Sequence, residues 1–147
     1  IVDGTLAYGP GDPNFGASPS VVHAGYTNSV AGATSTQLFV IDSALDALVQ
    51  QNPANAGTLT TIGALGVDAT EIGGFDISGA TGTAFLIARG VQADRSVLTT
   101  VNLQTGAATT VGEIGGGVLI TGLSVVPTPG SVVLLAMGGV VAARRRR

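Results

Sequence analysis

The chain has 147 residues, which suits one domain of ordinary size followed by a tail. It contains no cysteine, and this excludes disulfides, thiolate metal sites and cysteine nucleophiles. Four of its six basic residues stand together at 144–147, so the acidic body before them offers no electrostatic footprint for nucleic acid.

The body of the chain reads as a series of short β-strands. Apolar runs rich in Val, Ile, Leu and Thr are separated by Gly, Asn and Asp, a pattern typical of strands and tight turns. The expected strands lie at about 21–27, 37–42, 58–63, 73–77, 83–88, 97–103, 108–114 and 120–126. Residues 43–51 are the only stretch with modest helical character, and we expect a short helix or a loop there.

Two series of segments within the body resemble each other. The first comprises residues 38–42, 58–63 and 74–78, and the second comprises 98–102, 108–112 and 122–125. A repeat of about four strands is typical of a propeller blade. We therefore expect an all-β fold of repeated antiparallel strands, a partial β-propeller of about two blades. Chance similarity between Thr-rich hairpins is the alternative.

The candidates for chemistry are few. Asp68, Glu71 and Asp76 could gather oxygen ligands for Ca²⁺. The competing interpretation is that Asp42, Asp68 and Asp76 cap turns by accepting backbone N–H groups, and paired-carboxylate glycosidase chemistry is a third. His23, the only histidine, is expected to be structural, because no second His or Cys can join it in a transition-metal site.

The last 21 residues form a distinct tail. Pro127, Thr128 and Pro129 end the preceding strand, and twelve uncharged residues follow at 132–143, before Arg144, Arg145, Arg146 and Arg147. As an apolar helix these twelve would span roughly 18 Å, less than the ~30 Å of a bilayer core. We expect a transient membrane anchor whose arginines stay cytoplasmic, or alternatively a terminal helix packed on the body.

This tail resembles the PEP-CTERM sorting signals of Gram-negative bacteria that make exopolysaccharide, with Thr128 where those signals have Glu. The resemblance implies export, transient anchoring in the inner membrane, processing by a membrane protease of the exosortase type, and delivery to the cell surface or the outside. An exported protein carries a leader, which residues near Ile1 do not provide. We therefore expect residues 1–126 to be an N-terminally incomplete propeller-like domain and 127–147 to be the sorting segment.

Residues 20–126 also resemble a bacterial propeller-like domain family of unknown function that often carries such tails. The motifs lie at 26–29, 38–42, 52–59, 63–68 and 74–77, and no catalytic residues are established for that family. The expected function is a non-enzymatic surface or matrix module without a cofactor, whose partners are the membrane, the sorting protease and exopolysaccharide or surface proteins. The alternative is a Ca²⁺-dependent hydrolase or lactonase of the propeller type.

Overall fold

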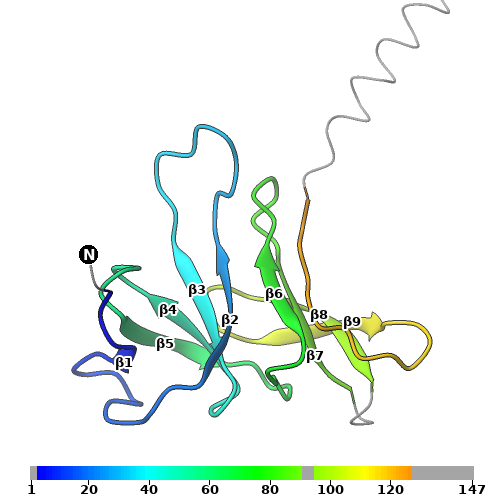
Figure 1. Cartoon of the computed structure of the whole chain (residues 1–147), viewed down its shortest axis with the longest axis horizontal. Helices are drawn as coiled ribbons and strands as arrows, with labels where there is room; N and C mark the ends of the chain where they lie inside the picture. The colour runs from blue at the N-terminus through cyan, green and yellow to red at the C-terminus, as the bar shows by residue number, and fades with distance from the viewer. Residues whose placement is uncertain (1–2, 91–94, 127–147) are drawn as a thin grey trace, which may run out of the picture.

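The computed structural model describes residues 3–90 and 95–126, which form nine β-strands in two sheets (Figure 1). The strands are β1 Ala7–Tyr8, β2 Val21–Tyr26, β3 Leu38–Asp42, β4 Ala47–Gln51, β5 Thr58–Ala64, β6 Gly74–Ile77, β7 Ala84–Arg89, β8 Ser96–Val101 and β9 Ala108–Glu113. The prediction of an all-β chain is confirmed for these residues. The short C-terminal helix expected at 132–143 lies outside them.

Each sheet is built around a four-stranded antiparallel meander in chain order. The first sheet has the order β1-β5-β4-β3-β2, in which β1 pairs in parallel with β5, and the second has the order β6-β7-β8-β9. The inner strands β2 and β6 contact each other in the middle of the molecule (Figure 1). This arrangement is a pair of stacked sheets, and the partial propeller stays a prediction.

Strand β4 corrects the expectation of a helix or loop at residues 43–51. Ala47, Leu48 and Val49 are all buried, and β4 pairs with β3 on one side and β5 on the other. A strand in the centre of a sheet is covered on both faces, so it shows no polar alternation that would reveal it in the sequence. The four residues before it form the turn, in which Asp46 has a positive φ of 47°.

The strand predicted at residues 120–126 is also wrong, because these residues form no strand. The N–H of Ile120 donates to the Ser96 hydroxyl oxygen at 2.8 Å, and the N–H of Val125 donates to a carboxylate oxygen of Asp76 at 2.7 Å. Because side chains of the second sheet accept these N–H groups, the segment lies along that sheet without joining a backbone ladder.

The register shows that the two meanders are equivalent strand by strand. A bulge interrupts the pairing of β4 with β5 between Leu48 and Val49, and another interrupts that of β8 with β9 between Leu98 and Thr99. Both bulges lie between the last two strands of their meander, with Leu48 opposite Gly63 and Leu98 opposite Gly112. A repeat therefore exists, and β4 corresponds to β8.

The predicted match of residues 38–42 with residues 98–102 is therefore wrong. The first segment is β3, the second strand of its meander, whereas the second segment belongs mainly to β8, the third strand. Both are β-branched runs followed by an acidic or amide residue, and local similarity of that kind does not report position in a sheet. The predicted match of residues 58–63 with 108–112 is consistent with the structure, because β5 and β9 are each the last strand of their meander.

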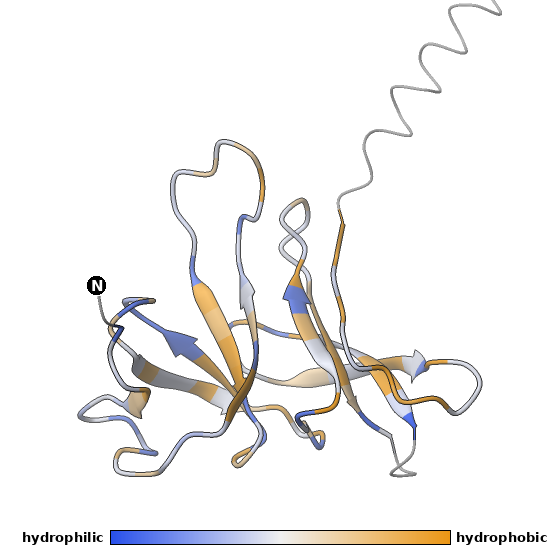
Figure 2. Ribbon diagram, viewed as in Figure 1, coloured by the Kyte–Doolittle hydropathy of each residue, from blue (hydrophilic) through white to orange (hydrophobic). Residues whose placement is uncertain are grey.

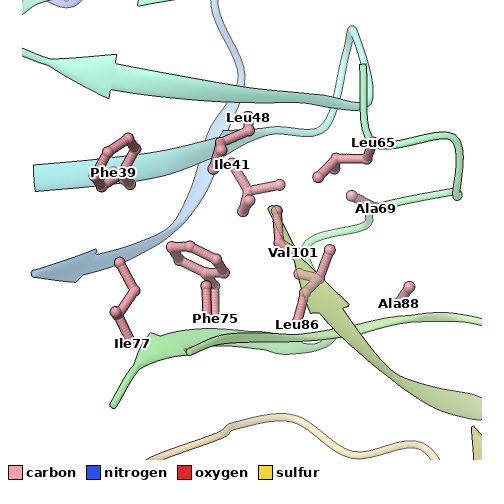
Figure 3. Close-up of a cluster of buried hydrophobic side chains, with 11 residues drawn as sticks. Phe39, Ile41, Leu48, Leu65, Ala69, Phe75, Ile77, Leu86, Ala88 and Val101 are labelled. Carbon is pink, nitrogen blue, oxygen red and sulfur yellow. The ribbon is translucent and has the colours of Figure 1, made fainter. Parts of the chain in front are cut away.

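The main core lies between the sheets. Phe39, Ile41 and Leu48 from the first sheet meet Phe75, Leu86 and Val101 from the second (Figure 3). The ribbon of β3, which supplies two of these residues, is hydrophobic along most of its length (Figure 2). A smaller cluster on the opposite face of the first sheet contains Tyr8, Val40, Val49 and Leu59. β3 is buried on both faces because it contributes to both clusters.

Candidate functional site

The connection between the sheets, residues 65–73, carries the two acidic residues that the structure brings together. Three contacts hold its backbone in place. The N–H of Leu65 donates to the Asp46 carbonyl, the N–H of Ala69 donates to the Asp46 carboxylate at 2.8 Å, and the N–H of Arg89 donates to the Asp68 carbonyl. Asp68 and Glu71 are thereby placed at the surface of the junction between the two sheets.

Two pockets lie on either side of this connection and share Asp68 and Arg89. One, of about 340 Å³, is lined by Ser20, Val22, Ser43, Asp68, Ala69, Thr70, Glu71, Ile72 and Arg89. The other, of about 410 Å³, is lined by Val67, Asp68, Ala88, Arg89, Gly90, Val97, Thr99, Thr110 and Glu113. The Arg89 guanidinium Nε lies 4.0 Å from an Asp68 carboxylate oxygen, so this loose ion pair stands where the two pockets meet.

The chemistry of these pockets suits a small polar ligand more than a buried reaction. Their walls offer hydroxyls, three carboxylates and one guanidinium, and the side chains of Asp68 and Arg89 are 58% and 34% exposed. An exposed pair of this kind is screened by water and holds its partners weakly. The sequence did not lead us to expect Arg89 at a site. Arg89 is one of only two basic residues before position 144, and this rarity was a usable signal.

The three residues predicted for Ca²⁺ do not share one site. Asp68 faces Arg89 and Glu71 lines the first pocket, whereas both carboxylate oxygens of Asp76 accept backbone N–H groups, from Ile77 and from Val125. Residues 3–90 and 95–126 contain no group of three His, Asp or Glu side chains placed to hold a metal ion. The capping interpretation describes Asp76 well, and Ca²⁺ binding stays a prediction without a geometric site.

Asp42 is also a capping residue, and its second interaction was not foreseen. Its carboxylate is fully buried, accepts the Ala44 N–H at 2.9 Å across the β3–β4 turn, and accepts the hydroxyl of Tyr8 at 2.6 Å. Burial, this hydrogen bond and the charge of Asp42 hold the pKa of Tyr8 well above its ordinary value of 10.0. The two residues are 34 positions apart in the sequence, which explains why no local pattern predicts the pair.

Asp12 fixes the same N-terminal segment at a second point. Its carboxylate accepts the N–H and the hydroxyl of Thr61 at 2.6 and 2.8 Å and the N–H of Asn14 at 2.8 Å. Burial acts to raise the pKa of Asp12, but these hydrogen bonds outweigh it and keep the pKa below its ordinary value of 3.8.

His23 has the structural role expected of it. On β2 its Nε2 lies 2.9 Å from the carbonyl oxygen of Thr70, which requires the proton on Nε2 because a carbonyl can only accept. The contact ties the first sheet to the connection between the sheets.

A third pocket, of about 640 Å³, lies at the loop between β2 and β3 and is lined by Tyr26, Asn28, Ser29, Val30, Ala31, Ala33 and Thr36. The residues predicted for sorting, 127–129 and 144–147, lie outside the described part of the chain. Within residues 3–90 and 95–126 there is no helix long and apolar enough to cross a membrane.

Comparison with known proteins gives one match. A family model described as a domain of unknown function, DUF4394, matches residues 1–124, and so also covers the first 19 residues that the motif resemblance left out. No curated protein and no protein of solved structure matches the chain.

Proposed function

The chain belongs to the DUF4394 family of domains of unknown function, and we propose that this member is an exported, non-enzymatic module of the β-propeller type. It acts at the cell surface or in the extracellular matrix, after transient anchoring in the inner membrane. Its partners there are exopolysaccharide or surface proteins.

The observation that carries the proposal is the layout of the last 21 residues. A Pro-Thr-Pro motif at 127–129 is followed, after Gly130 and Ser131, by twelve uncharged residues without a polar side chain and then by four arginines. The apolar run favours insertion, and the arginine cluster sets the orientation by remaining on the cytoplasmic side. Everything before residue 127 is then carried across the membrane.

The two equivalent meanders support the propeller part of the proposal. Propellers repeat a four-stranded antiparallel sheet with the inner strands side by side, and β2 and β6 stand in that relation here. The more polar of the two pockets beside residues 65–73, lined by Ser20, Ser43, Thr70 and Glu71 among others, gives such a module a place to hold a hydroxyl-rich ligand such as a saccharide.

The test is fractionation of the chain expressed behind a cleavable export leader in a Gram-negative host. The full chain should be found in the membrane fraction, and a variant lacking residues 127–147 should be released in soluble form. A third variant, with Arg144 to Arg147 replaced by Gln, keeps the apolar run and should lose its fixed orientation, measured by protease access to the body. Equal partition of the full and shortened chains would contradict the proposal.

A further inference from the structure

The two sheets present the same apolar surface, but only the first uses it inside the molecule. In register terms, Phe39, Ile41, Leu48 and Ile62 of the first sheet correspond to Phe85, Ile87, Leu98 and Val111 of the second. The first four pack into the core between the sheets. Their four counterparts lie on the face of the second sheet that points away from the first, here called the outer face.

Two equivalent glycines show the same difference between the first sheet and the second. A Cβ on Gly63 would lie 2.2 Å from the Thr105 carbonyl oxygen, because the β8–β9 turn of the second sheet presses against the end of β5. Its counterpart Gly112 has nothing within 4 Å. The surface that receives a neighbouring sheet at Gly63 is therefore present again at Gly112, and within residues 3–90 and 95–126 nothing lies against it there.

Residues 114–126 cover only part of the outer face. Their hydrogen bonds to Ser96 and Asp76 hold them near β6 and one end of the sheet, and Ile87 is 2% exposed beneath them. Phe85 and Leu98 are half-buried, and Val111 is 61% exposed. The remaining side chains in the middle of this face, Thr100 and Thr109, are uncharged, so an identical surface can approach without charge repulsion.

The opposite end of the stack is closed. The N-terminal segment lies against the far face of the first sheet, where the Asp12 carboxylate accepts the N–H and the hydroxyl of Thr61 at 2.6 and 2.8 Å. The Tyr8 hydroxyl also fixes this segment to the first sheet by donating a hydrogen bond to the buried carboxylate of Asp42. Head-to-tail stacking of copies would have to break these contacts, whereas the uncovered parts of two outer faces can meet without displacing residues 3–90 or 95–126.

We propose that the outer face of the second sheet is a homodimer interface, through which two copies of the chain pack sheet against sheet about a two-fold axis. Such a self-complementary interface closes after two copies, as in the commonest class of homo-oligomers. The inference goes beyond the proposed export function and does not depend on it.

The size of the face sets the expected strength. Four strands about 4.8 Å apart, with about six residues at about 3.4 Å each, make a face of roughly 19 Å by 20 Å. Residues 114–126 cover part of it, and even the whole face is below the roughly 800 Å² per partner of a standard interface, so we expect a weak, reversible dimer.

The test exploits the absence of cysteine. Val111→Cys puts a single thiol on the outer face of the full chain, and Val30→Cys puts one on the exposed loop between β2 and β3 as the matched control. With a short bismaleimide in mild detergent, V111C should form a covalent dimer and V30C should remain monomeric. Association through residues 132–143 would cross-link both variants alike, and equal cross-linking of the two, or none with V111C, would overturn the proposal.

Sedimentation of Val111→Glu gives an independent measure. Val111 is exposed in the monomer, so the variant should fold normally while burying an unpaired charge in the dimer. The dissociation constant should rise at least tenfold, about 1.4 kcal/mol, relative to Val30→Glu. Unchanged sedimentation of V111E relative to V30E would exclude pairing through the outer face.

Discussion

At the scale of single residues, the Tyr8 hydroxyl donates a hydrogen bond to the fully buried carboxylate of Asp42. Tyr8→Phe removes the hydroxyl and leaves the buried carboxylate with one partner fewer, which should lower the free energy of unfolding by about 1–3 kcal/mol. Urea denaturation at neutral pH measures the loss. Tyr26→Phe is the control, because Tyr26 is 46% exposed, and equal losses in the two variants would contradict the role of the hydrogen bond.

The same pair sets a pH dependence whose sign follows from the raised pKa of Tyr8. Folding favours the neutral phenol, so the stability it contributes is present below pH 10.0, the ordinary pKa, and is lost as pH rises above it toward the folded-state pKa. Between neutral pH and strongly alkaline pH, Y8F should therefore lose less stability than the parent chain.

At the scale of elements, the close approach of β5 to the β8–β9 turn can be tested with its own internal control. Gly63→Ala places a Cβ against the Thr105 carbonyl oxygen, so the backbone must move. The free energy of unfolding should fall by about 1–3 kcal/mol. Gly112→Ala at the equivalent bulge meets nothing within 4 Å and should change stability by less than about 0.5 kcal/mol. Thermal denaturation of both variants at low concentration decides this, and similar shifts would mean that the two positions are not distinguished by packing.

At the scale of the whole molecule, one core joins the two sheets, so damage on one sheet should be felt by the other. Leu48→Ala empties a fully buried position between the sheets and should cost about 2–5 kcal/mol. Leu98→Ala changes the equivalent position on the outer face, where the side chain is half-buried, and should cost roughly 1 kcal/mol. Hydrogen exchange should show L48A accelerating amides of β7 and β8 as well as β3. Loss confined to the first sheet would argue for independent units.

The strands that the sequence predicts are those whose signals are local. β2, β5 and β9 each have a Gly or Asn within two residues of one end, and most of their residues are partly or fully exposed. β4 is hidden because both of its faces are covered, and the two residues of β1 have no pattern at all. β1 exists only because β5, some 50 residues later, offers it an edge.

The residues of the candidate site were likewise predictable only in part. Asp68 and Glu71 stand out as charges in a Gly-rich connection, and the structure places both at one pocket. Arg89 lines that pocket from the end of β7 in the second sheet. Asp76 does not line it, and its carboxylate accepts the N–H of Val125 instead. Both outcomes depend on contacts between segments distant in sequence, so neither could be derived from spacing.

The parallel pairing of β1 with β5 also has a consequence for the order in which the chain folds. Every other pairing in the first sheet joins strands adjacent in sequence, whereas β1 must wait for a partner about 50 residues away. Closing so long a loop is entropically slower than zipping hairpins. We expect the four-stranded meander of the first sheet to assemble first, so that the earliest residues of the domain are the last to settle on that sheet, and the Tyr8 hydroxyl meets Asp42 only once its surroundings are already formed.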